Sequence, residues 1–209
     1  ARNNLWRAVA YACHPDAWGV QIVFDNKVIL GTRARKTRTK SFNAFSSIDY
    51  PETAMFRDRR LIQFLQRPAE YTHAVFSTAL DPNVFVLRLV PGMRADIIPM
   101  LEGRYRALVL ESFGVGGLPG GDDGAMFAAV RDWCGAGHLA VFTTQVPHEG
   151  SDLAVYEVGR AAKALPGVLE AHDMTPEATA VKLMWVLGQT TDRAKAEKLF
   201  LTPVQWDIL

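Results

Sequence analysis

Cysteine and clustered metal ligands are scarce in this sequence of 209 residues. The two cysteines, Cys13 and Cys134, lie far apart without a CxxC or Cys/His spacing, and His148-Glu149 has no second histidine four residues further on. These absences argue against a disulfide framework, a structural zinc site and the zinc-protease pattern. We therefore expect no metal, and a protein of the reducing cytoplasm.

Long apolar runs and an excess of one charge are also missing. Runs such as residues 84–87 and 107–110 are far shorter than the roughly 20 residues that cross a bilayer. Lys and Arg number 23 and Asp and Glu 22, which gives a net charge of +1 and no global field that would attract nucleic acid or an anionic membrane. We expect a soluble protein with neither nucleic acid nor a membrane as partner.

The first residues lack an initiator Met, an apolar signal core and a cleavage-site pattern. They read at once as a helix, with Leu5, Val9 and Ala12 on one face. We expect the chain to begin in mid-domain, as part of something longer.

The pattern of predicted secondary structure changes along the chain. Residues 18–24 and 27–30 predict a hairpin around Asp25-Asn26, whereas the proline-containing residues 46–83 read as an irregular connection with one or two short strands. From Val84 onward, strands alternate with helices, which indicates an α/β fold with a mainly parallel sheet flanked by helices on both faces. The predicted strands are 84–90, 107–113 and 139–146, and the predicted helices are 95–101, 123–134, 156–165 and 173–189.

Two helix starts have sequence signatures. Thr175-Pro176-Glu177 supplies an N-cap, a proline at the first helical position and a first-turn acid, and Asp122-Asp123 is expected to cap the helix that follows it. In the last predicted helix, the stripe Ala178, Val181, Leu183 and Leu187 is expected to face the core.

The glycine-rich loop, GVGGLPGG at residues 114–121, follows a predicted strand and precedes a helix, where a phosphate-cradling loop would lie. Pro119 replaces the third glycine of GxGxxG and no Lys-Ser/Thr pair follows, so the nucleotide-binding interpretation is disfavoured. Ser112 with Gly114 resembles a nucleophile elbow, but Leu110 stands where the leading glycine belongs. We expect the loop to use glycine's φ freedom to bring its backbone near a ligand or a partner chain.

The most basic stretch is GTRARKTRTKSFNAF, residues 31–45. Its residues alone favour a solvated strand edge, in which Lys36 is one of several surface charges. The stretch also resembles a segment of bacterial-type L-asparaginases, Gly-x-Arg-x-x-Lys followed by Phe-x-Ala-Phe. NVFVLRLVPGM, ALVLESFGVGGLP and HDMTPEATAVKL resemble further segments of that family, in the family's order and over nearly the whole chain. Phe42-Asn43-Ala44-Phe45 and Asp-Met-Thr favour its cytoplasmic type I branch.

The resemblance implies a role for Lys36. In that family a lysine at this position belongs to a Thr-Asp-Lys relay, in which a threonine hydroxyl attacks the side-chain amide of asparagine. A threonine needs such activation, because it is a weak nucleophile on its own. The family's Thr-Gly-Gly-Thr and Thr-Asp-Thr motifs do not occur in this sequence. We therefore expect residues 1–67 to be the remainder of an incomplete N-terminal catalytic domain, 68–83 a linker, and 84–209 a complete C-terminal α/β domain.

A second expectation concerns an extra asparagine site found in some type I members. The resemblance places a substrate or second-site loop at Glu111, Ser112, Gly114, Gly116 and Gly117. Glu111 stands where those members have arginine and Gly117 where they have asparagine. We expect Glu111 to be an unpaired charge there and no neighbouring group to restore asparagine binding, and hence no allosteric control through this pocket.

The resemblance thus implies an L-asparaginase that hydrolyses L-asparagine to L-aspartate and ammonia, without a cofactor, as a homo-oligomer (a dimer or dimer of dimers). Two alternatives stay open. One is a non-catalytic C-terminal module for assembly or ligand binding. The other is a related amidase or glutaminase, such as a glutamyl-tRNA amidotransferase subunit.

Overall fold

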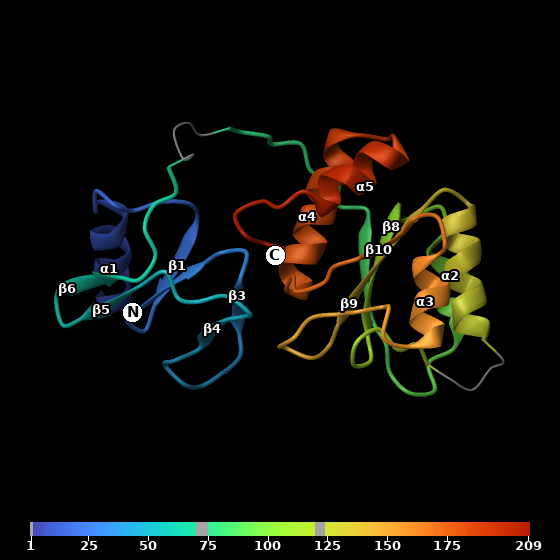
Figure 1. The fold of residues 1–209 in the computed structure, drawn as a ribbon, viewed down its shortest axis with the longest axis horizontal. Helices are drawn as coiled ribbons and strands as arrows, with labels where there is room; N and C mark the ends of the chain where they lie inside the picture. The colour runs from blue at the N-terminus through green and yellow to red at the C-terminus, as the bar shows by residue number, and fades with distance from the viewer. Residues whose placement is uncertain (1, 70–74, 120–123) are drawn as a thin grey trace. The chain divides into compact units, whose positions relative to one another are not determined.

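The computed structural model describes residues 2–69, 75–119 and 124–209. The chain divides into two compact units, residues 1–77 and residues 78–209 (Figure 1). The elements of the N-terminal unit are α1 (Arg2–Ala12), β1 (Gln21–Phe24), β2 (Lys27–Leu30), β3 (Ala34–Lys36), β4 (Phe45–Ser47), β5 (Ala54–Arg57) and β6 (Arg60–Gln63). Those of the C-terminal unit are β7 (Val84–Arg88), η1 (Ala95–Ile97), η2 (Pro99–Leu101), β8 (Ala107–Ser112), α2 (Ala125–Gly135), β9 (Leu139–Thr144), α3 (Glu157–Lys163), β10 (Val168–Glu170), α4 (Pro176–Gln189) and α5 (Arg193–Leu201).

The N-terminal unit is built on an antiparallel sheet of order β1-β2-β5-β6, with β3 and β4 forming a separate two-stranded hairpin. The predicted hairpin between β1 and β2 is confirmed: Asp25 and Asn26 both have left-handed backbones, with φ of 48° and 69°. Such a turn matches the twist of the strands that it joins, and Asn and Asp tolerate it well. The one or two short strands expected in residues 46–83 are β5 and β6, which pair through a turn at Asp58, whose φ is 56°.

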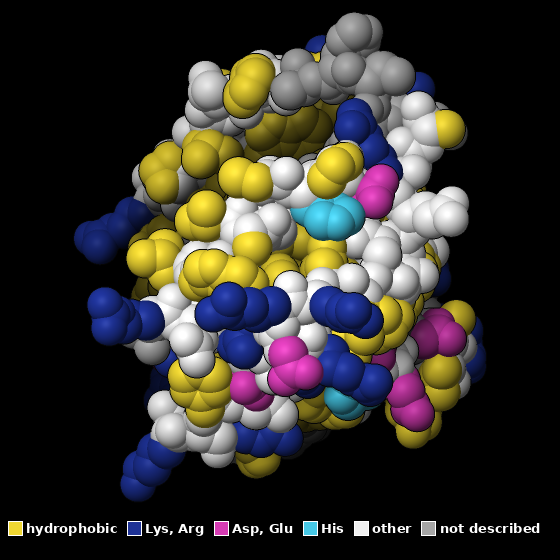
Figure 2. All heavy atoms as spheres, turned by 90° about the vertical axis from the view of Figure 1, so that its left-hand side faces the viewer, with side chains coloured by type: hydrophobic (Ala, Val, Ile, Leu, Met, Phe, Trp, Pro, Cys, Tyr) yellow, Lys and Arg dark blue, Asp and Glu magenta, His cyan; other side chains and the backbone are white. Residues whose placement is uncertain are grey.

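Helix α1 presents its apolar residues outward. Leu5 and Val9 are 68% and 56% exposed, while Tyr11 is buried and Trp6 meets Phe56 edge to face at 6.0 Å between ring centroids. Figure 2 looks onto the side where α1 and the β5–β6 hairpin are drawn in Figure 1, and it shows hydrophobic side chains interspersed with Lys and Arg. The face of α1 that the sequence singled out is therefore not part of the described core.

The C-terminal unit confirms the predicted α/β class. Its sheet has the order β10-β9-β8-β7 and all neighbouring strands are parallel. One face of the sheet packs on a cluster that includes Leu183 and Val186 of α4 and Phe200 of α5. The other face packs on Val130 and Trp133 of α2 and on the segments around it. Helices thus cover both faces (Figure 1), so β8 and β9 are buried almost throughout and read as continuous apolar runs.

Three local features differ from the sequence-based prediction. The helix predicted at 95–101 consists of two short 3₁₀ helices, η1 and η2, and Pro99 at the start of η2 cannot donate the N–H that a continuous α-helix needs. The short strand β10 and the helix α5 were not predicted. The capping role expected of Asp122 and Asp123 lies outside the described residues.

The start of α4 is as predicted. Thr175 accepts a hydrogen bond from the Ala178 amide at 3.1 Å, and Pro176 occupies the first helical position. The prediction that this helix faces the core through Leu183 and Leu187 is confirmed, since both are buried. It is wrong for Val181, which is 58% exposed. No helix within the described ranges is long and apolar enough to cross a membrane.

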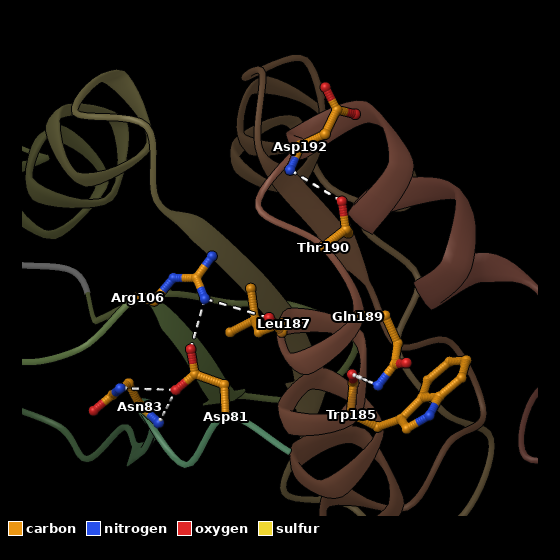
Figure 3. Close-up of polar contacts among 8 residues, drawn as sticks. All are labelled: Asp81, Asn83, Arg106, Trp185, Leu187, Gln189, Thr190 and Asp192. Atoms are coloured by element: carbon orange, nitrogen blue, oxygen red, sulfur yellow. Dashed lines mark hydrogen bonds and ion pairs between the residues drawn. The ribbon is translucent and has the colours of Figure 1, made fainter. Parts of the chain in front are cut away.

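The residues that enter the C-terminal unit are held by a polar network (Figure 3). Arg106 Nη1 donates to Asp81 Oδ2 at 2.6 Å and to the Leu187 carbonyl of α4 at 3.3 Å. Asp81 Oδ1 accepts from the Asn83 amide at 2.9 Å. Burial opposes ionisation of Asp81, but the hydrogen bonds from Asn83 and the charge of Arg106 outweigh it and lower the pKa of Asp81.

A second contact fixes the same segment to α4. Gln189 Nε2 donates to the Ala79 carbonyl at 2.8 Å. A side chain at Gly188 would clash with that carbonyl oxygen, so glycine permits the close approach. Residues 79–83 are therefore docked on the C-terminal unit.

Candidate functional site

Lys36, the candidate catalytic residue, is the last residue of β3 and lies opposite Phe45 of β4. Its side chain is exposed. The hairpin that carries it is anchored by aromatic contacts, since the Phe24 ring lies 5.3 Å from the Phe45 ring and 5.7 Å from the Phe42 ring. These contacts fix the hairpin and leave the Lys36 ammonium accessible.

The basic residues around Lys36 have separate surroundings. Arg33 is fully buried, with its guanidinium 5.7 Å from the centre of the Tyr50 ring. Burial raises the pKa of Tyr50, and the charge of Arg33 opposes that shift. Arg38 donates to the Asn43 carbonyl at 3.2 Å and so closes the loop of the hairpin. The positive charge at residues 31–45 is thus partly structural, and Lys36 and Lys40 are its exposed lysines.

The other candidate residues lie together at the carboxyl end of β8. Ser112 is fully buried, and its hydroxyl donates to the Thr143 carbonyl at 2.7 Å. That hydrogen bond and the burial deny it the exposed position of a nucleophile-elbow serine. The carboxyl edge of a parallel sheet is nevertheless the usual place for ligands in an α/β fold.

The loop after β8 reverses on itself, and we refer to residues 113–117 as the 113–117 turn. The amides of Gly116 and Gly117 both donate to the Phe113 carbonyl, at 3.0 and 2.7 Å. Gly114 has a φ of +48° and Gly116 one of +148°. A Cβ at Gly116 would stand 2.5 Å from Leu153 Cδ2, so a side chain there would displace Leu153 as well as strain the backbone. Two amides of the turn are used internally, which does not suit a phosphate cradle.

Two residues at the carboxyl end of β9, Thr144 and Gln145, hold the turn and the end of β8, and were missed by sequence reasoning. Thr144 Oγ1 donates to the Gly114 carbonyl at 2.5 Å. Gln145 Nε2 donates to the carbonyls of Leu89 and Glu111, at 2.6 and 2.8 Å. Their signal was available, since polar residues at the carboxyl end of a buried parallel strand lie at the same edge as those at the end of its neighbour.

Glu111 has a cationic neighbour. Arg88 of β7 lies in register with Glu111, and its Nη1 is 3.4 Å from Glu111 Oε2. The Glu111 side chain is 12% exposed and that of Arg88 60% exposed. Glu111 is therefore not an unpaired charge, because strand pairing brings in a residue 23 positions away that no local pattern indicates.

The structure thus gathers Glu111, Ser112, Gly114, Gly116 and Gly117 in the C-terminal unit, whereas Lys36 belongs to the N-terminal unit. Within the described ranges, no three His, Cys, Asp or Glu side chains group as a metal site would require.

Both units match parts of one family. The pattern of the "Glutaminase/Asparaginase C-terminal domain" matches residues 83–200, and that of "Asparaginase, N-terminal" matches residues 1–70. The chain belongs to the glutaminase/asparaginase family.

Among curated proteins, the L-asparaginase of Thermococcus kodakarensis is 38% identical over 200 residues, which cover 95% of this chain and 60% of that protein. A glutamyl-tRNA(Gln) amidotransferase subunit of Pyrococcus furiosus is 33% identical over 177 residues, which cover 82% of this chain and 39% of that protein. The chain therefore spans less than two thirds of the length of these relatives.

Solved structures give the same relationship. The thermostable L-asparaginase from Thermococcus kodakarensis matches with a TM-score of 0.90 at 34% identity, over 99% of this chain and 62% of that one. L-asparaginase I from Vibrio cholerae matches with a TM-score of 0.83 at 22% identity, over 100% of this chain and 62% of that one. The second likeness concerns the fold alone.

Proposed function

We propose that this chain is the C-terminal part of an L-asparaginase, which hydrolyses L-asparagine to L-aspartate and ammonia. The observation that carries the proposal is the 38% identity, over 95% of the chain, to the L-asparaginase of Thermococcus kodakarensis. In this proposal Lys36 is the one catalytic group that the chain supplies, as the lysine of a Thr-Asp-Lys relay. Its exposed ammonium is accessible to groups outside the described residues.

The remaining parts of the relay would come from residues that this sequence does not contain. Thr-Gly-Gly-Thr and Thr-Asp-Thr are absent from it, and the matched relatives are longer. The outward apolar face of α1, with Leu5 and Val9, supports the same proposal, since large exposed apolar faces are usually contact surfaces. Those further residues would cover it, whether they belong to the same polypeptide or to another.

The proposal has a domain arrangement. Residues 1–67 would be the C-terminal remainder of the catalytic domain, 68–83 the connection, and 84–209 the C-terminal domain. Phe42-Asn43-Ala44-Phe45 and the Asp-Met-Thr turn support the cytoplasmic type I branch, and a solved Campylobacter jejuni relative is described as a probable cytoplasmic L-asparaginase. We further propose a homo-oligomer, a dimer or dimer of dimers, that needs no cofactor.

Two alternatives each have an observation in their favour. The chain is 33% identical to a subunit of a glutamyl-tRNA(Gln) amidotransferase, so a related amidase that takes glutamine as its amide donor is the second candidate. A non-catalytic module for assembly or ligand binding is the third, because the chain contains no threonine nucleophile motif.

Ammonia release discriminates among the three candidates. The complete protein and the isolated 209-residue chain are assayed with L-asparagine and with L-glutamine. The proposal expects hydrolysis of L-asparagine by the complete protein and none by the isolated chain. Hydrolysis of glutamine without that of asparagine would favour the amidotransferase class. The absence of hydrolysis with both amides would favour the module.

A further inference from the structure

Glu170 is a buried acid that forms the centre of a polar network at the carboxyl end of β10. Its side chain is 4% exposed. Glu170 Oε1 accepts a hydrogen bond from the Leu153 amide at 2.6 Å, and Oε2 accepts one from Lys163 Nζ at 2.9 Å. His172 Nδ1 lies 3.8 Å from Oε2. A buried carboxylate is retained when such partners compensate its lost hydration.

The segment that Glu170 holds, residues 150–153, supports the 113–117 turn in its own right. The Asp152 amide donates to the Val115 carbonyl at 2.8 Å. Leu153 is 1% exposed, and its Cδ2 fills the space that a side chain on Gly116 would need. One neighbouring pair of residues, Asp152 and Leu153, therefore connects the carboxylate of Glu170 to the turn by a hydrogen bond and by packing.

Residues 150–153 form neither a helix nor a strand. Besides the packing of Leu153 in the core, their backbone is held by the Ser151 amide, which donates to the His172 carbonyl at 2.8 Å. That anchor also depends on the turn after β10. If Glu170 lost its carboxylate, the Leu153 amide would be buried without its acceptor, at a cost typical of an unsatisfied buried donor.

We propose that Glu170 is a positioning residue that sets the conformation of the 113–117 turn, acting through Leu153 and Asp152 without touching a ligand. The inference rests on the proposed function in one respect: it treats this turn as part of the substrate site or of a second asparagine site. Lys163, the last residue of α3, donates to the Glu170 carboxylate and holds it in place, so it is part of the same hydrogen-bond network.

The test uses the complete protein with Glu170→Ala and the isosteric Glu170→Gln, and Glu197→Gln as a control. Glu197 forms an ion pair with Arg193, with their side chains about a third exposed, and this pair lies within α5. Amide hydrogen exchange is measured for residues 113–117 and 150–153 and for the buried strand β9. We expect exchange in the two loops to rise about tenfold in Glu170→Ala, the equivalent of about 1.4 kcal/mol. β9 and the Glu197→Gln protein should remain unchanged.

Glu170→Gln keeps an oxygen for the Leu153 amide, so its exchange should lie between those of the wild type and Glu170→Ala. It also carries the test if Glu170→Ala does not fold. Unchanged exchange at 113–117 in a folded Glu170→Ala protein, or in Glu170→Gln where only that variant folds, would overturn the inference, as would an equal rise in β9. With asparagine as substrate, we expect Glu170→Ala to raise KM about tenfold and to keep kcat within about twofold of the wild type. Glu170→Gln should bring KM most of the way back to the wild-type value. The exchange result stands even if the protein does not hydrolyse asparagine, so a failure of the proposed function remains distinguishable.

Discussion

The ammonium of Lys182 lies 2.8 Å from the carboxylate of Asp207, and their side chains are only 4% and 3% exposed. Lys182 Nζ also donates to the Thr202 carbonyl at 2.8 Å and lies 5.7 Å from the centre of the Phe200 ring. Burial lowers the pKa of Lys182, while its hydrogen bond and charge interaction with Asp207 oppose that shift. The pair joins the middle of α4 to the residues that follow α5.

Removing one partner of this pair should be far more damaging than removing both. We expect Lys182→Met to lower the free energy of unfolding by about 3–5 kcal/mol, because it leaves the Asp207 charge buried and unpaired. Lys182→Met combined with Asp207→Asn should recover much of that loss, since the amide oxygen can still accept the Val204 amide that now donates to Asp207. Urea unfolding measures all three proteins. A loss below about 1 kcal/mol in Lys182→Met, the range of an exposed pair, would contradict the expectation.

The network of Asp81 and Arg106 should make the protein sensitive to acid. The pKa of Asp81 lies below its ordinary value of 3.8 in the folded state, so the unfolded chain takes up this proton first as the pH falls. The stabilisation is complete above the ordinary pKa and is lost as the pH falls through the lower, folded value. Asp81→Asn should therefore be less stable than the wild type at about pH 7, and the difference should shrink below about pH 4.

Unfolding curves at about pH 7, 4 and 3 measure this difference. Asp96→Asn is a suitable control, because the Asp96 side chain is 46% exposed and its pairing with Arg94 should matter little. A stability difference between wild type and Asp81→Asn that stays constant across this range would exclude the linkage.

The parts of the fold that the sequence predicted are those with local signals. The turn at Asp25-Asn26 and the cap at Thr175 are each encoded within a few residues, and the buried strands β8 and β9 are long apolar runs. β10 has three residues, which is too short for a pattern. The four-residue strands β5 and β6 stood in a proline-containing stretch for which one or two short strands were predicted, but without bounds.

The candidate site depended more strongly on long-range pairing. Arg88 meets Glu111 only because β7 and β8 are parallel in one particular register, and sequence periodicity does not fix the register between distant strands. Likewise, Glu170 and Leu153 are 17 positions apart with no shared pattern. Lys36 was identified through the family resemblance, since its own surroundings are those of an ordinary exposed strand residue.

If Lys36 takes part in proton transfer, its loss should affect turnover. In the complete protein we expect Lys36→Ala to reduce kcat by about two orders of magnitude or more, which is typical of a lost proton-transfer group. Lys40→Ala removes another exposed lysine from the same basic stretch and should leave kcat within about twofold, because exposed charges contribute little. Steady-state rates of ammonia release measure both. A folded Lys36→Ala protein that keeps most of its kcat would show that Lys36 is an ordinary surface charge without a catalytic role.

The pair of Arg88 and Glu111 bears on regulation. A second asparagine bound at this edge of the sheet would bring its carboxylate towards Glu111, and Arg88 is already engaged with Glu111 at 3.4 Å. Gly117 has no side chain with which to replace a lost amide hydrogen bond. A like charge in a recognition site typically costs several kcal/mol of binding, so we expect hyperbolic kinetics in asparagine for the complete protein.

Glu111→Gln, which removes the like charge, should stay hyperbolic because Gly117 still offers no donor. Glu102→Gln is a control on an exposed acid of the same unit. A sigmoidal curve that becomes hyperbolic in Arg88→Ala but not in Glu102→Gln would instead demonstrate a regulatory site built around Arg88.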